Sequence, residues 1–193
     1  PSYIEEGCRE LAELDAPLGV FAVLGNHDTY TGADAVALGL ETWTRIRLLR
    51  NDWVRIELEG GALALAGVED PGHGWNERDG THEALERLAS EIPADLSRLL
   101  LIHRPSWFGQ AARLGFPLAL AGHTHGGQIA LPRPGQHHNV SRLISRWTRG
   151  LFRDPETGSI LYVNRGLGVA GPPVRLHCAR EISLLRVVST RSA

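Results

Sequence analysis

Two histidines one residue apart follow a short apolar run, in the heptapeptide Gly-His-Thr-His-Gly-Gly-Gln at 122–128. Neutral imidazole is a common ligand of divalent metals, and strand alternation would point two such rings to opposite sides. On a loop beyond the strand end both rings can face one site, and the flanking glycines let the backbone approach a ligand closely. His123 and His125 are therefore candidate metal ligands, and the alternative is a surface pair in a turn.

An apolar strand, a small or polar turn and a histidine follow one another at three places in the chain. Gly-Asn-His-Asp at 25–28 follows the apolar run at 20–24, His103 follows the run at 99–102, and the histidine pair follows the run at 117–121. In open α/β sheets, ligands bind outside the carboxyl ends of the strands, so loops that are distant in sequence can converge there. Four histidines and an asparagine on three such loops favour a metal site over isolated structural histidines.

The composition is typical of one globular α/β domain. The chain has 193 residues, of which 42% are hydrophobic, and a formal net charge of −2, so no nucleic-acid scaffold is expected. Cys8 and Cys178 are too few for a disulfide framework, which predicts two buried side chains. No run approaches the roughly 18 apolar residues of a membrane span. The chain begins at Pro1 and contains no methionine, so it is interpreted as a processed or partial product.

Hydrophobic periodicity and breaker residues predict helices that alternate with strands, followed by hairpins rich in strands. Helices are expected at 2–14, 33–40, 81–91 and 107–114, with a loop at 26–32. Besides the run at 117–121, strands are expected at 18–24, 54–59, 62–67, 98–102, 128–131, 159–164 and 182–188. This order predicts a single α/β domain over 1–193, built as a layered sandwich with mixed sheets.

In its three histidine loops the chain resembles the calcineurin-like metallophosphoesterase family. The matching motifs, in the family's order, are Gly-Asn-His-Asp at 25–28, His103 in Leu-Leu-Ile-His-Arg-Pro, and Gly-His-Thr-His at 122–125. The segments at 161–168 and 173–176 are similar to a membrane-associated bacterial branch that includes cell-envelope phosphoesterases and a UDP-2,3-diacylglucosamine hydrolase. The resemblance runs over essentially the whole chain and implies an α/β/β/α sandwich.

The resemblance also implies a role for each residue of these motifs. The implied metal ligands are Asn26, His103 and His123 for one ion and His125 for a second. Amide oxygen and neutral imidazole suit divalent Mn, Fe or Zn. A metal-bound hydroxide would attack phosphorus while His27 assists the leaving group, and Asp28 would hold the His27 ring. The reaction would hydrolyse a phosphodiester, pyrophosphate or phosphomonoester bond of a lipid-linked or nucleotide-linked substrate.

The family's first two motifs are missing from this chain. They are an Asp-x-His and a Gly-Asp-x-x-Asp, which supply ligands of one metal and the carboxylate that bridges both ions. The chain is therefore expected to lack the first strand-helix-strand portion, on the order of 30 residues, and to leave a sheet edge or face uncovered. Two interpretations stay open: an enzyme that binds two ions in its complete form, and a non-catalytic fragment that binds one.

A basic amphipathic insertion is predicted at 132–158. Five arginines lie between 133 and 153 with no acidic residue among them, and Leu143, Trp147 and other apolar residues recur at helical spacing. The pattern predicts either an interfacial helix within 132–153 that contacts anionic lipid, or a helix packed on the protein's own core. The protein would accordingly be membrane-associated or cytoplasmic.

Two weaker signals follow the strand at 62–67. Asp70 either caps its own loop or takes part in chemistry, and capping is favoured because aspartate readily bonds the backbone of its own turn. His73 and Trp75, in the glycine-rich stretch beyond it, form either a lid over the substrate or a plain surface loop.

Overall fold

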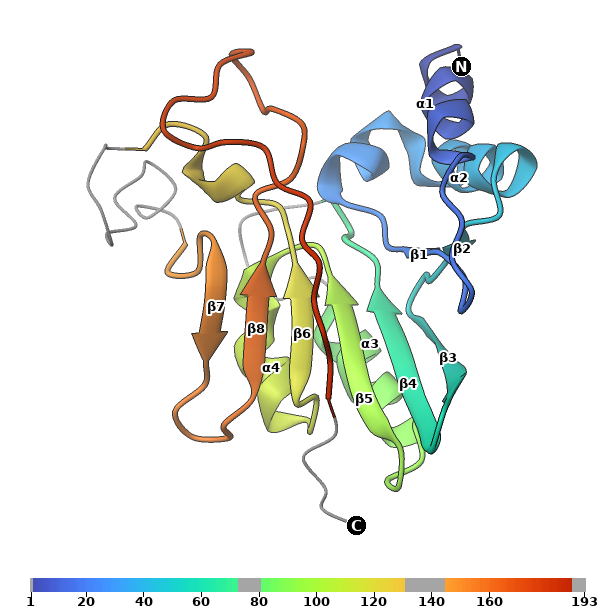
Figure 1. Ribbon diagram of the computed structural model, residues 1–193, viewed down its shortest axis with the longest axis vertical. Helices are drawn as coiled ribbons and strands as arrows, with labels where there is room; N and C mark the ends of the chain where they lie inside the picture. Colours follow the sequence, from blue (N-terminus) through green and yellow to red (C-terminus); the bar gives the residue numbers. More distant parts are fainter. Residues whose placement is uncertain (1, 73–80, 131–144, 189–193) are drawn as a thin grey trace.

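A six-stranded mixed sheet forms the centre of the computed structural model, which describes residues 2–72, 81–130 and 145–188 (Figure 1). In sheet order its strands are β3 (Asp52–Leu58), β4 (Gly61–Val68), β5 (Ser97–Ile102), β6 (Leu118–Ala121), β8 (Ile160–Val163) and β7 (Gly150–Arg153). The four inner strands are parallel, and the two edge strands are antiparallel to their neighbours. The carboxyl ends of the inner strands therefore meet at one edge of the sheet.

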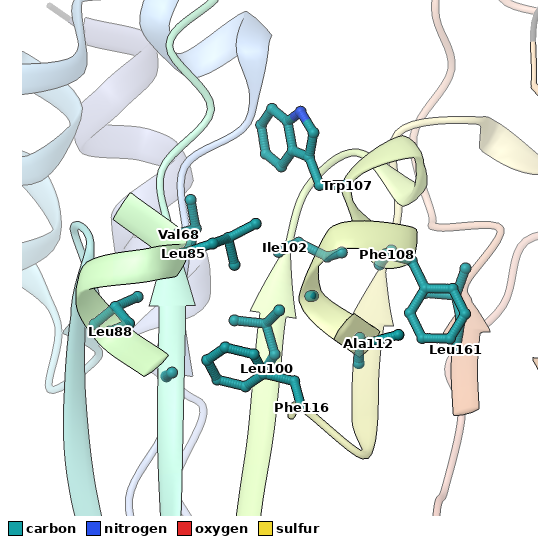
Figure 2. Close-up of a cluster of buried hydrophobic side chains, with 14 of the residues drawn as sticks. Val68, Leu85, Leu88, Leu100, Ile102, Trp107, Phe108, Ala112, Phe116 and Leu161 are labelled. Atoms are coloured by element: carbon teal, nitrogen blue, oxygen red, sulfur yellow. The ribbon is translucent and has the colours of Figure 1, made fainter. Parts of the chain in front are cut away.

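Two helices cover one face of this sheet. α3 (Thr81–Glu91) connects β4 to β5, and α4 (Phe108–Arg113), which follows the 3-10 turn η1 (Pro105–Trp107), connects β5 to β6. Alternate side chains of the strands point at these helices and form the main core (Figure 2). Its fully buried members include Leu85, Leu88, Leu100, Phe108, Phe116 and Leu161. Burial of each such side chain contributes about 1.5–3 kcal/mol, so this layer holds the inner strands in register.

The opposite face of the sheet is covered less completely. The C-terminal segment runs down this face (Figure 1), and a small cluster around Leu49 packs against β3 and β4. Leucines of β5 and β6 on this face remain half-buried, namely Leu99, Leu101, Leu118 and Leu120. Among the described residues, the two faces of the sheet therefore differ in how completely they are buried.

A separate pair of short parallel strands carries the first histidine loop. β1 (Phe21–Ala22) pairs with β2 (Arg47–Leu48), and beside them α1 (Ser2–Leu11) packs on α2 (Asn26–Trp43). The backbone N–H of Asp70, beyond the end of β4, donates to the carbonyl oxygen of Leu24 at 3.2 Å. The first turn of α2 is thereby joined to the carboxyl edge of the large sheet (Figure 1).

A central mixed sheet flanked by helices confirms the predicted α/β class, and α3 has the predicted bounds. The loop predicted at 26–32 is wrong, because α2 begins at Asn26 and continues through this segment. The Asp28 carboxylate accepts the backbone N–H of Gly25 at 2.7 Å, so it caps the helix seven residues before the predicted start. Gly32, with φ of 117°, interrupts the helix and accounts for the apparent break in its pattern.

The predictions for the C-terminal half need three corrections. Within 128–130 the expected strand is reduced to a bridge between Ile129 and Leu176, and 182–188 is not a strand. The helix expected within 132–153 is wrong at 150–153, where β7 pairs with β8 along an open sheet edge. Gly150 has φ of 84°, which ends any helical pattern there.

The described part of the insertion packs on the protein's own core. The Trp147 ring lies edge-on to Phe108, with centroids 5.9 Å apart, and Phe152 also contacts the core. The rest of the predicted interfacial helix, from 132 to 144, and the predicted lid residues His73 and Trp75 lie outside the described residues. Within the described ranges no helix is both long and apolar enough to cross a membrane.

Candidate metal centre

Three loops bring an amide oxygen and two imidazoles together at the carboxyl edge of the sheet. Asn26 opens α2, His103 follows β5, and His123 follows β6. Oδ1 of Asn26 lies 2.9 Å from Nε2 of His103, which in turn lies 3.1 Å from Nδ1 of His123. Strand ends that are far apart in the sequence thus meet here.

The spacing of these three atoms fits a single divalent ion. Nitrogen and oxygen ligands about 2.0–2.1 Å from one ion lie roughly 3 Å apart when their bonds to it are near a right angle. One oxygen and two nitrogen donors suit Mn, Fe or Zn. No cluster of three or more His, Cys, Asp or Glu side chains placed to hold a metal occurs among the described residues. Within the described ranges the site therefore depends on the Asn26 amide as its third donor.

Burial keeps both imidazoles in the form that binds metals. It lowers the pKa of His103 to about 4, and the nearby charge of His123 adds to the effect. Burial likewise lowers the pKa of His123 to about 4, assisted by the guanidinium of Arg104. Both rings are therefore neutral near pH 7 and offer a free nitrogen lone pair to a cation.

The two residues after Asn26 differ in their surroundings. His27 is exposed on the first turn of α2, where its ring lies edge-on to Tyr30 with centroids 5.6 Å apart. Asp28 bonds the backbone of Gly25 and so fixes the turn that carries Asn26 and His27. The implied contact between Asp28 and the His27 ring stays a prediction, since the bond seen for Asp28 is this helix cap.

His125 lies beside the three donor residues but faces another segment. Its backbone has φ of 51°, and its ring is half-buried. Burial lowers its pKa, and the nearby backbone of Gly168 acts in the opposite direction. The charge of His125 adds a smaller contribution to the lowered pKa values of His103 and His123.

A buried ion pair between Asp70 and Arg104 lies next to the candidate metal centre. Asp70 is fully buried, and its carboxylate accepts Nε of Arg104 at 2.7 Å and Nη2 of the same residue at 3.0 Å. It also accepts the backbone N–H of Gly72, two residues on, which is the loop capping that the sequence favoured. Arg104 directly follows His103 but could not be assigned a role from sequence, because its partner Asp70 becomes its neighbour only when β4 and β5 pair.

A second group of side chains, also missed from sequence, attaches the C-terminal segment to the end of β8. The Glu181 carboxylate accepts hydrogen bonds from the hydroxyl groups of Tyr162 and Ser183 and from the guanidinium of Arg165. Cys178, buried as predicted, donates its thiol to the carbonyl oxygen of His125 at 3.2 Å. These contacts connect the chain after β8 to the His125 loop.

Acid should loosen this attachment. Burial raises the pKa of Glu181, but hydrogen bonds from Tyr162, Arg165 and Ser183 outweigh it and lower the pKa from its ordinary value of 4.5 to about 2. The ionised carboxylate therefore stabilises the fold above about pH 4.5, and this contribution is lost as the pH falls toward about 2. We expect the melting temperature of the Glu181→Gln variant to fall less steeply than that of the wild type across this window, measured by circular dichroism. Equal slopes would contradict the assignment, and Glu57→Gln, whose side chain is 72% exposed, is the control.

Comparison with known proteins agrees with the motifs. No family model and no solved structure matches the chain. It is 33% identical over 183 residues to the uncharacterized metallophosphoesterase YkuE of Bacillus subtilis, an alignment that covers 93% of the chain and 60% of that relative. An uncharacterized metallophosphoesterase of Aquifex aeolicus is 32% identical over 179 residues, covering 92% of the chain and 64% of the relative.

A bovine protein, named transmembrane protein with metallophosphoesterase domain, is 32% identical over 201 residues that cover 95% of the chain and 42% of the relative. The chain thus spans between two fifths and two thirds of the length of these three relatives. Over nearly all of its own length, this chain is similar to proteins named metallophosphoesterases.

Proposed function

We propose that the protein carrying this chain is a metal-dependent phosphoesterase. The observation that carries the proposal is the convergence of Asn26, His103 and His123. The Asn26 Oδ1 atom lies 2.9 Å from Nε2 of His103, and that nitrogen lies 3.1 Å from Nδ1 of His123. Similarity to proteins named metallophosphoesterases supports the same reaction class. A divalent ion bound there would polarise phosphoryl oxygens and make a water molecule more acidic.

We assign different roles to the residues of the site. Asn26, His103 and His123 would hold one ion, and His125 would be a ligand of a second ion. His27 is exposed on the first turn of α2, next to these residues, where an incoming ester can reach it. Its ring would donate a proton to the leaving-group oxygen or stabilise the charge that develops there, and general acids accelerate such steps about 100- to 10,000-fold.

The substrate is proposed to be a phosphodiester, pyrophosphate or phosphomonoester that is lipid-linked or nucleotide-linked. The basic character of 132–153, with five arginines and no acidic residue, supports contact with anionic lipid. Co-sedimentation with anionic vesicles tests this contact. A variant with Arg146→Glu and Arg149→Glu that sediments like the wild type would refute it.

Metal content and turnover together test the reaction. We expect the full-length protein to hold two divalent ions and to hydrolyse a nitrophenyl phosphodiester, and His27→Ala to lower kcat by about 100- to 10,000-fold with unchanged metal content. His82→Ala, which alters a histidine at the start of α3, is the control and should behave like the wild type. If His27→Ala retained the turnover of the wild type, the proposed role of His27 at the leaving group would be refuted. One ion or none, without turnover, would favour a non-catalytic metal-binding domain.

A further inference from the structure

Thr29 connects the first turn of α2 to the carboxyl edge of the large sheet. Its hydroxyl donates to the backbone carbonyl oxygen of Asp70 at 2.7 Å, and the carbonyl oxygen of Gly25 lies 3.3 Å away. Asp70 follows β4, whereas Gly25 immediately precedes the candidate ligand Asn26. One hydroxyl group therefore links the turn that carries Asn26 to the end of a central strand.

The carbon atoms of the same side chain pack closely against Gly72. A Cβ at Gly72 would lie 2.7 Å from Cγ2 and 2.9 Å from Cβ of Thr29, closer than van der Waals contact allows. Gly72 also has φ of 78°, a conformation that favours glycine. The absence of a side chain at Gly72 thus lets the loop after β4 approach Thr29, whose methyl and hydroxyl groups both contact this loop.

The hydrogen-bond partner of Thr29 is itself held in place. Asp70 is fully buried, and its carboxylate accepts Nε of Arg104 at 2.7 Å and the backbone N–H of Gly72 at 2.9 Å. Arg104 directly follows His103 in the chain. A series of hydrogen bonds therefore runs from the residue next to His103, through Asp70, to Thr29 on the turn that carries Asn26.

Two other hydrogen bonds of this region have different effects. The Asp28 carboxylate accepts the backbone N–H of Gly25, a bond within the turn that leaves its distance from the sheet unfixed. The backbone N–H of Asp70 donates to the carbonyl oxygen of Leu24, which holds the chain before the turn. Without the Thr29 hydroxyl, the carbonyl oxygen of buried Asp70 loses this donor, which is unfavourable, and the first turn of α2 is expected to shift.

We propose that Thr29 is a positioning residue, which holds Oδ1 of Asn26 at its distance of 2.9 Å from Nε2 of His103. The inference rests on the proposed function, in which Asn26, His103 and His123 bind one ion. The two histidines follow β5 and β6, whose pairing positions them without Thr29. Loss of the hydroxyl should therefore displace one of the three ligands and weaken binding of that ion.

Two variants of the full-length protein separate the hydroxyl from the shape of the side chain. Thr29→Val keeps the branched shape and removes the hydroxyl, whereas Thr29→Ser keeps the hydroxyl. In the metal-free protein, hydrogen exchange followed by mass spectrometry should be faster in Thr29→Val at Thr29 and Asp70, whose backbone N–H groups are bonded to the carbonyl oxygens of Gly25 and Leu24.

Metal binding gives the second measurement. Isothermal titration with Zn²⁺ should show an affinity about 10-fold lower in Thr29→Val, at the lower end of the range found when groups that orient metal ligands are removed. Thr29→Ser should bind Zn²⁺ like the wild type. The site in question is identified as the one that Asn26→Ala weakens.

Two control variants separate positioning from general stability. Thr42 also lies on α2, but its hydroxyl donates to the carbonyl oxygen of Leu38 within the helix, at 2.6 Å. Thr42→Val should therefore keep the Zn²⁺ affinity of the wild type. Leu88 is fully buried in the main core, so Leu88→Ala should lower the melting temperature through a cavity, without changing Zn²⁺ affinity below the melting range.

The possible failures are distinct. If the wild type binds Zn²⁺ and Thr29→Val binds it equally well, or Thr29→Ser loses as much affinity as Thr29→Val, the positioning role is refuted and the proposed function stands. An equal loss in Thr42→Val or Leu88→Ala, or a loss in Thr29→Val without faster exchange at Asp70, would also refute it. If the wild type itself binds no Zn²⁺, the metal centre fails, and the role of Thr29 fails with it.

Discussion

Replacing Asp70 with alanine is expected to lower the free energy of unfolding by about 3–5 kcal/mol, because it leaves a buried guanidinium without its counter-ion. Asp70 is fully buried, and the side chain of Arg104, its partner at 2.7 Å, is 11% exposed. The same carboxylate holds the backbone N–H of Gly72, and the backbone of Asp70 bonds Leu24 and Thr29. The variant would therefore disturb the loops on both sides of the candidate metal centre.

Asp34→Ala is the matched control for this prediction. Asp34 also lies 2.7 Å from an arginine, Arg50, but its side chain is 93% exposed. Exposed pairs contribute about 0–1 kcal/mol, since water screens the charges. Urea denaturation of both variants compares the two environments directly. A loss in Asp70→Ala no larger than that in Asp34→Ala would show that the buried pair does not support this edge of the sheet.

Replacing Gly25 with alanine is expected to lower metal affinity at the site by about 100-fold, at the upper end of the effects of displaced ligand supports. A Cβ at this position would lie 2.7 Å from Cε1 and 2.9 Å from Nε2 of His103, closer than van der Waals contact allows. The His103 ring would have to move away from Asn26 and His123. With φ in the range open to all residues, the effect would arise from this contact and not from backbone strain.

Gly122→Ala provides the control at a second glycine of the same site. Gly122 directly precedes His123, yet a Cβ there meets nothing within 4 Å. We expect its metal affinity, measured by isothermal titration with Zn²⁺, to remain within about twofold of the wild type. If both glycine variants lost affinity equally, the contact with His103 would not be the cause. If Gly25→Ala bound Zn²⁺ like the wild type, the arrangement of Asn26 and His103 described above would be wrong.

Features that depend on neighbouring residues could be predicted from sequence. α3 has its predicted bounds because Leu85 and Leu88 recur with the helical period between polar residues. The predicted strand before His103 also agrees with β5 to within one residue, since its apolar run is short and ends at polar residues. The early start of α2 was missed although the spacing of Gly25 and Asp28 carried a capping signal.

Features that depend on which strands become neighbours could not be predicted. Residues 150–153 form a strand because the edge of β8 is available for pairing, although apolar residues at helical spacing before them predict a helix through this range. Asp70 and Arg104 lie 34 positions apart and meet because β4 and β5 are adjacent. Arg175 contacts His125 across 50 positions, through a C-terminal segment without regular secondary structure.

By itself, the sequence determined the types of the candidate ligands and their positions after apolar strands, because a strand that ends in glycine, asparagine or histidine is a local pattern. Only the tertiary structure decided which of them meet. His103 lies within hydrogen-bonding distance of both Asn26 and His123, whereas the carbonyl oxygen of His125 accepts a hydrogen bond from Arg175. The physical reason is that parallel pairing of β5 and β6 places their carboxyl ends side by side. The chain turns after His123, so His125 lies next to the C-terminal segment.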